Sequence, residues 1–305
     1  MLKDKIYNRE SGLLFYGLTP PKNNVDPEKI QSIANKQIER LQGIDIDALI
    51  LYDIQDESAR TDVPRPFPYM STLAPDEYEA NYLQDLKVPK IIYKSVGKYP
   101  ESVFRAWYSK LGKSVGANVF VGTPTPDQVN NLSLSDAYAI KKEINPTLPL
   151  GGVTIPERHA ELKDEPQRIF YKIDNGCSFF VSQCVYNINQ TKDFLSDYYY
   201  ASLEQNRPLV PIIFTLTPCG SLKTLEFMEW LGVHVPKWLY NDLKSSNDIL
   251  AQSVHACKNI AIEIIEYAKA KNIPVGFNIE SVSIRKEEID ASIELLKEVK
   301  KLMEL

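Results

Sequence analysis

The chain alternates short apolar runs with amphipathic segments along almost its whole length, and this alternation most constrains its fold. The apolar runs expected to form strands are Leu13–Leu18, Ala48–Ile54, Lys90–Val96, Ala117–Thr123, Leu148–Ile155, Cys177–Cys184, Leu209–Leu216 and Val275–Val282. Between them, apolar residues recur at helical spacing, as within Ile30–Leu41, Ser102–Val115 and Asn247–Lys271. Strands that alternate with helices in this way predict a parallel sheet with helices packed against it.

Eight such units in 305 residues fit a (β/α)₈ TIM barrel, whose usual length is ~250 residues. The sequence therefore predicts one barrel domain over residues 1–305, closed on its outside by a helix at Glu287–Leu305. An open Rossmann-like sheet is the rival, but no G-x-G-x-x-G turn follows the first strand and no linker divides the chain into halves. On length alone, two small domains stay possible.

Charge and hydropathy limit the classes of partner. A net charge of −5 lacks the basic excess that nucleic-acid binding uses. We find no apolar stretch of ~18 residues and no signal-peptide core after Met1, so we expect a cytoplasmic protein that binds no membrane. The four cysteines show no C-x-x-C spacing, and they are expected to be buried thiols rather than metal ligands or disulfides.

In a β/α barrel, polar residues at the C-terminal ends of the strands face the functional site. Gln183 is the strongest such candidate, because an amide within an apolar strand must be hydrogen-bonded by a ligand or by neighbouring backbone. His159 is either a ligand contact or an exposed loop residue. The long segment Gln55–Ala74 after the second strand is typical of a functional loop.

Two further groups of charged residues carry alternative hypotheses. Asp53, Asp56 and Glu57 would serve as acids or bases if desolvated, or would form ion pairs with Arg60 and Lys94. A desolvated Lys94 would suit a Schiff-base aldolase or isomerase.

Three segments resemble the methylenetetrahydrofolate reductase family, a group of β/α barrels that hold FAD and a reduced folate. They are Val153–His159, Lys172–Gln183, and the stretch that runs from Val210–Phe214 to Val233–Pro236. Pro20–Pro21 and Glu57–Thr61 fit the same pattern.

The resemblance implies a role for several residues. Gln183 matches the glutamine that hydrogen-bonds the folate pterin, and the other expected folate contacts are Tyr16, Arg60, Thr123, Tyr186 and Arg285. His159, Lys172 and Thr154 are the expected FAD contacts.

The sequence also departs from the family at its catalytic centre. Gly17 stands where the reductases have a glutamate that acts as the acid, and Val121–Thr125 replaces a turn that carries an aspartate. If the acid has moved to another strand, Glu57 and Glu280 are the candidates.

Two hypotheses about function follow from this resemblance. The first is a divergent reductase of one-carbon and methionine metabolism, an oxidoreductase that uses FAD to reduce methylene-tetrahydrofolate. The alternative is a folate-binding protein or methyl-folate carrier without flavin, which hands its ligand to a methyl-transfer partner. A homo-oligomer is compatible with either.

Overall fold

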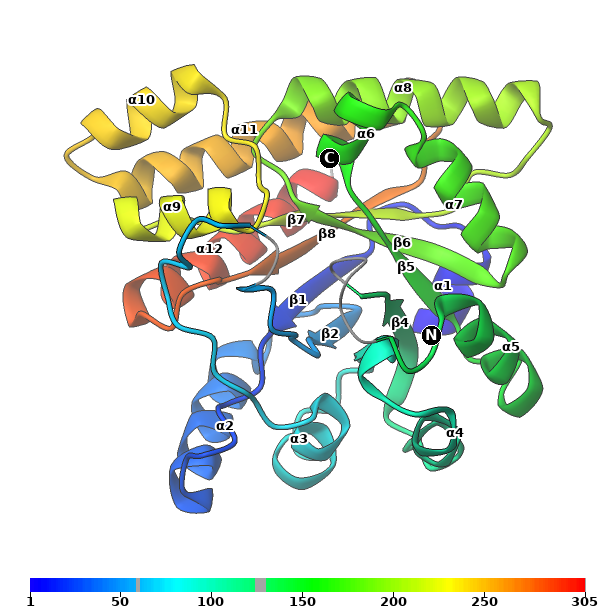
Figure 1. Cartoon of the computed structure of the whole chain (residues 1–305). Coiled ribbons are helices and arrows are strands. Elements are labelled where there is room, and N and C mark those ends of the chain that lie inside the picture. The colour runs from blue at the N-terminus through cyan, green and yellow to red at the C-terminus, as the bar shows by residue number, and fades with distance from the viewer. Residues whose placement is uncertain (59–60, 124–129, 305) are drawn as a thin grey trace.

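The computed structural model describes residues 1–58, 61–123 and 130–304. Its centre is a closed barrel of parallel strands in sequence order, with β1 hydrogen-bonded to β8 (Figure 1). The strands are β1 Leu14–Leu18, β2 Ala48–Leu51, β3 Lys90–Ser95, β4 Val115–Val121, β5 Leu150–Thr154, β6 Cys177–Cys184, β7 Ile212–Leu216 and β8 Val275–Glu280. The predicted TIM barrel is therefore confirmed, and the pairing of β1 with β8 excludes the open sheet.

Helices surround the barrel (Figure 1). They are α1 Leu2–Tyr7, α2 Pro27–Leu41, α3 Pro75–Tyr82, α4 Glu101–Ser109, α5 Leu134–Ile144, α6 Pro156–Leu162, α7 Glu165–Asp174, α8 Ile188–Glu204, α9 Leu222–Trp230, α10 Lys237–Ser245, α11 Ile249–Lys269 and α12 Lys286–Met303. Side chains that accept a backbone N–H fix the starts of α5, α9 and α11, at Ser133, Ser221 and Asp248. Among the helices of the described residues, none has both the length and the apolar character needed to cross a membrane.

Two apolar clusters divide the core. The smaller one fills the barrel interior with side chains such as Phe15, Ile50 and Val119, and Leu2 and Ile6 of α1 join it from below. The larger one lies between the barrel and the helices. Successive strand residues point to opposite faces of the sheet, so membership of the smaller cluster shows which strand positions face the barrel axis.

The strands agree with the predicted ranges to within a few residues, and the main differences have visible causes. Strand β2 ends at Leu51 rather than Ile54, because Asp53 turns to bind the next strand: its Oδ2 accepts the Ser95 N–H at 2.8 Å and its Oδ1 accepts Lys98 Nζ at 2.6 Å. The closing helix begins at Lys286, close to the predicted start.

Candidate functional site

The C-terminal ends of the strands form what we call the barrel mouth. On β1, Phe15 points into the interior cluster, so Gly17 two residues later also faces the barrel axis. Glu280 pairs with Gly17 across the β1–β8 closure and faces the same way. Tyr52, just beyond β2, packs against the top of the interior cluster. These three residues come together although they lie far apart in sequence.

Gly17 leaves a space that two other side chains fill. A Cβ built at Gly17 would lie 2.9 Å from both Cε2 and Oη of Tyr52, and 3.0 Å from Oε2 of Glu280. The two distances to Tyr52 are shorter than real Cβ contacts and the distance to Glu280 is tighter than most, so a side chain at position 17 would require Tyr52 to shift. The Glu280 carboxyl group of β8 thus lies in the space beside Gly17.

Hydrogen bonds hold this carboxyl group in the mouth. Tyr52 donates its hydroxyl to Glu280 and accepts Asn278 Nδ2 at 2.8 Å. Asn278 Nδ2 also lies 3.2 Å from Thr215 Oγ1, and Asn278 Oδ1 is buried with no hydrogen-bond partner among the described residues. Tyr52 packs edge-on against Tyr93, with ring centroids 4.8 Å apart. The result is a polar group on top of an apolar barrel core.

Burial raises the pKa of the Glu280 carboxyl above its ordinary value, although its hydrogen bonds with Tyr52 and Asn278 act in the opposite direction. Desolvation favours the neutral form of a carboxyl group, because the charged form loses its hydration. A desolvated carboxyl group can bind a ligand through hydrogen bonds or exchange a proton with it.

Gln183 and Glu157 each bind backbone of the segment that follows α9. Gln183 Nε2 donates to the carbonyl oxygen of Leu231 at 3.0 Å, so one side of the amide is bound by backbone. Glu157, at the start of α6, accepts the backbone N–H of His234, and its Oε2 is buried without a hydrogen-bond partner in the described part of the chain. Burial raises the pKa of Glu157 to about 7. Glu157 was not among the predicted acids.

The residues predicted to hold FAD face away from the mouth. Thr154 follows Val153, which packs against the interior cluster, so Thr154 points outward and its Oγ1 lies 3.0 Å from Oε1 of the buried Glu165. His159 is 1% exposed, and its Nε2 lies 2.9 Å from Asp197 Oδ2 on α8. Lys172 Nζ donates to the carbonyl oxygen of Val153 at 2.6 Å. These side chains therefore bind protein groups in the helix layer rather than a shared cavity.

Two expected folate contacts, Tyr16 and Tyr186, lie among the helices in this structure. Tyr16 neighbours Gly17 and so points outward, where its hydroxyl lies 2.7 Å from Ser292 Oγ on α12. Tyr186 donates its hydroxyl to the carbonyl oxygen of Thr217 at 2.8 Å, and its ring belongs to the outer cluster. Both are buried. Strand alternation turns Tyr16 away from the barrel axis, whereas Tyr186 lies in the connection between β6 and α8.

The remaining candidates lie around the rim. Thr123 follows β4, and its Cγ2 would lie 2.6 Å from a Cβ built at Gly97. Glu57 is partly exposed in the loop after β2, and Arg285 is exposed, 3.7 Å from Glu288 Oε1. Arg60 lies outside the described residues.

Lys94 does not fit the Schiff-base hypothesis. It is 3% exposed, and its Nζ lies 3.9 Å from the ring centroid of Tyr99 and 4.4 Å from that of Trp107. Burial lowers the pKa of Lys94, yet the amine points into this aromatic cage on the outside of β3 and not into the barrel. The described residues contain no cluster of His, Cys, Asp or Glu that could hold a metal ion.

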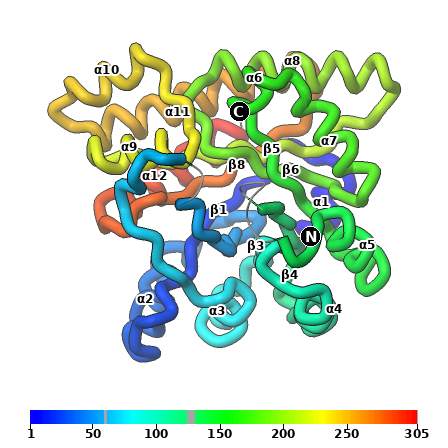
Figure 2. Tube along the Cα trace, in the orientation of Figure 1, coloured from blue at the N-terminus to red at the C-terminus, as the bar shows by residue number. Residues whose placement is uncertain are grey.

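Residues 61–73, which we call the strap, cover one side of the mouth. The strap lies beside α9 and then leads to α3 (Figure 2). Trp230 Nε1 donates to the carbonyl oxygen of Val63 at 2.9 Å, and the Arg65 guanidinium lies 5.0 Å from the ring centroid of Phe227. Its other end lies beside the loop after β1, where the Leu73 N–H donates to the carbonyl oxygen of Pro21 at 2.9 Å and the Asn23 N–H donates to that of Ser71 at 3.1 Å.

Replacing Trp230 by Phe is expected to loosen the strap without unfolding the barrel. The change removes one hydrogen bond, worth ~1 kcal/mol, and should speed amide hydrogen exchange within residues 61–73 about fivefold. Trp238→Phe on α10 is the control, since Trp238 is 61% exposed. Unchanged exchange in the strap would show that the Trp230 bond does not hold it.

Comparisons with known proteins bear on the family and the fold of the chain. The family model described as methylenetetrahydrofolate reductase matches residues 131–293. A solved structure described as an uncharacterized protein from Clostridium thermocellum that binds two copies of 5-methyl-5,6,7,8-tetrahydrofolic acid is 52% identical, covers 99% of each chain and has a TM-score of 0.88. A psychrophilic family 10 endo-β-1,4-xylanase is 12% identical, covers 98% of this chain and 99% of its own, has a TM-score of 0.50, and shares the fold alone. Among curated proteins, none matches the chain.

Proposed function

Since this chain belongs to the methylenetetrahydrofolate reductase family, we propose that it binds 5-methyl-tetrahydrofolate at the barrel mouth, with the pterin ring against Glu280. The observation that carries the proposal is the Glu280 carboxyl group beside Gly17, held by Tyr52 on top of the apolar barrel core. The 52% identical relative binds the same ligand, which supports this choice among folates.

The chemistry of the mouth suits a pterin. One edge of the pterin presents neighbouring N–H groups, and a carboxylate with two acceptor oxygens complements such a pair. The buried Asn278 Oδ1 and the Gln183 amide offer further hydrogen-bonding groups near the strand ends. The apolar faces of Tyr52 and Tyr93 offer aromatic surface for ring packing.

The residues that the family resemblance assigns to FAD do not fit a flavin in this chain. His159 and Thr154 are buried and bonded to acidic side chains, and Lys172 is bound to the backbone of β5. A flavin would have to break these contacts or use other residues. For this reason we favour folate binding without a flavin-dependent reduction.

Reduction of methylene-tetrahydrofolate remains the second candidate function, and one observation favours it. Glu280 occupies the space beside Gly17 where the family carries its acid, and its raised pKa suits a proton donor. In that role Glu280 would deliver a proton to the folate, while the hydride would come from a bound flavin.

Titration separates the two candidates. The purified protein is scanned for flavin absorbance and then titrated, in separate calorimetric experiments, with 5-methyl-tetrahydrofolate and with FAD. Folate binding without FAD binding is the expected result. Tight FAD binding, with bleaching of the flavin by a reductant and reoxidation by methylene-tetrahydrofolate, would favour the reductase. Failure to bind any folate would refute both.

A further inference from the structure

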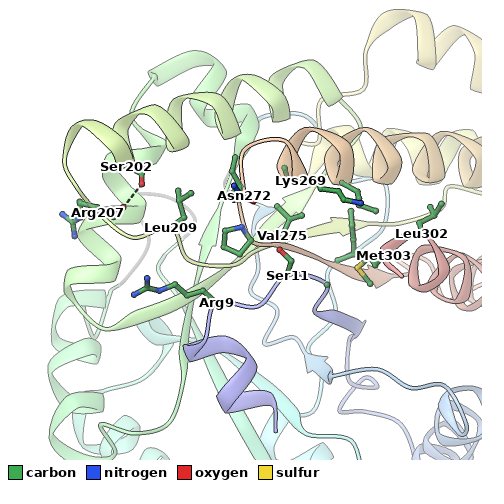
Figure 3. Close-up of a pocket in the computed structure, with 16 residues that line it drawn as sticks. Arg9, Ser11, Ser202, Arg207, Leu209, Lys269, Asn272, Val275, Leu302 and Met303 are labelled. Atoms are coloured by element: carbon green, nitrogen blue, oxygen red, sulfur yellow. Dashed lines mark hydrogen bonds between the residues drawn. The ribbon is translucent and has the colours of Figure 1, made fainter. Parts of the chain in front are cut away.

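A pocket of about 670 Å³ opens at the end of the barrel opposite the mouth. It lies where β7 and β8 begin, between the C-terminal ends of α8, α11 and α12 (Figure 3). Leu209, Val275 and Met303 line its apolar part. Its volume is within the range of ~300–1,000 Å³ that is usual for sites that bind small molecules.

The charge of this pocket is opposite to that of the chain. Its lining contains the cations Arg9, Arg207 and Lys269 and no carboxylate side chain, although the chain has a net charge of −5. Arg207 is engaged by Asp174 and lies 4.8 Å from the ring centroid of Phe170. Arg9 and Lys269 form no ion pair with the residues that the structure describes. The two are therefore available to an anion.

Apolar walls with cations at the rim suit one chemical class of ligand, an aromatic molecule with a carboxylate tail. A reduced folate belongs to this class, because its pterin and benzoyl rings end in a glutamate with two carboxylates. The relative that is 52% identical binds two copies of 5-methyl-tetrahydrofolate. The barrel has one mouth, so a second copy calls for a second cavity or for two ligands in the same one.

We propose that this pocket is a second reduced-folate site, in which Arg9 and Lys269 bind the glutamate tail and the rings pack against Leu209, Val275 and Met303. This inference rests on the proposed function, since it takes 5-methyl-tetrahydrofolate as the ligand of the chain. The two sites lie at opposite ends of the strands, so each can be removed without altering the other.

Calorimetric titration with 5-methyl-tetrahydrofolate tests the proposal through the number of sites. Wild-type protein is expected to bind two molecules. The double variant Arg9→Glu and Lys269→Glu should keep one site of unchanged affinity and weaken the other at least about tenfold, because two attractions become repulsions. The control is Lys29→Glu with Lys36→Glu on α2, which makes the same change in net charge at exposed lysines away from the pocket.

The variants also separate failure of this inference from failure of the proposed function. Two sites of unchanged affinity in the Arg9 and Lys269 variant would place both ligands at the mouth and overturn the inference. A single site in the wild type, weakened by Glu280→Gln and not by the pocket variant, would overturn it as well and leave the proposed function standing. A single site that is weakened only in the pocket variant would support folate binding in the pocket and refute folate binding at the mouth.

Discussion

Glu280→Gln is expected to weaken 5-methyl-tetrahydrofolate binding about tenfold to a hundredfold, the usual cost of losing a hydrogen bond to a charged group. The amide keeps the size of the side chain and its contact with Tyr52, but it offers one acceptor oxygen in place of two. Calorimetric titration measures the effect. Glu287→Gln is the matched control, since Glu287 is exposed in the first turn of α12. Equal affinity of the Glu280 variant and the wild type would remove Glu280 from the site.

Glu280→Gln should increase folding stability, although it weakens ligand binding. Burial raises the pKa of Glu280 in the folded protein above the ordinary value of 4.5, so the folded chain holds a proton that the unfolded chain releases. Glu280 therefore lowers the free energy of unfolding as the pH rises from 4.5 to the raised pKa, and above that pKa the loss is complete. Urea unfolding should find the glutamine variant increasingly stable relative to the wild type across this pH window. A group that costs stability and serves binding is typical of a functional site.

Gly17→Glu, which would restore the acid of the reductases to its usual position, is expected to destabilise the protein by at least ~1–3 kcal/mol and to give no reductase activity. The new Cβ would lie 2.9 Å from the Tyr52 ring and 3.0 Å from the Glu280 carboxyl, and a second carboxyl group would repel the first. Urea unfolding measures the loss of stability, and an assay with FAD and methylene-tetrahydrofolate measures activity.

Exchanging the two residues provides the control for this prediction. Gly17→Glu combined with Glu280→Gly returns one carboxyl group to the shared space from the other strand, and it should recover part of the lost stability. Gly112→Ala tests glycine replacement at an open position, where the nearest side-chain atom to the new Cβ would be 3.5 Å away. A stable Gly17→Glu variant would mean that Tyr52 and Glu280 move aside readily.

The fold could be predicted from the sequence because each strand is a short apolar run between polar turns. Runs such as Ala48–Leu51 and Cys177–Cys184 are buried on both faces, and this is a local property that the sequence displays. The direction of individual side chains was harder to predict. Tyr16 was predicted to contact the ligand, whereas in the structure its side chain points outward to α12 and its neighbour Gly17 faces the barrel axis.

The site was predictable only in part, because its contacts join distant strands. Glu280 was predicted, and the structure brings its carboxyl group beside Gly17, which supports its proposed role. Tyr52 and Asn278 were missed, since their hydrogen bond spans more than two hundred residues of sequence and forms only through barrel closure. One signal was available: an asparagine within the apolar strand Val275–Glu280 needs a buried partner.

The closure between β1 and β8 has a consequence for biosynthesis. Glu280 and Asn278 belong to the last barrel strand to leave the ribosome, whereas Gly17 belongs to the first and Tyr52 directly follows the second. A nascent chain therefore has no complete mouth until its final strand is inserted. Once the barrel is closed, a folate that contacts both β1 and β8 would stabilise the pairing of these two strands, which is the last to form.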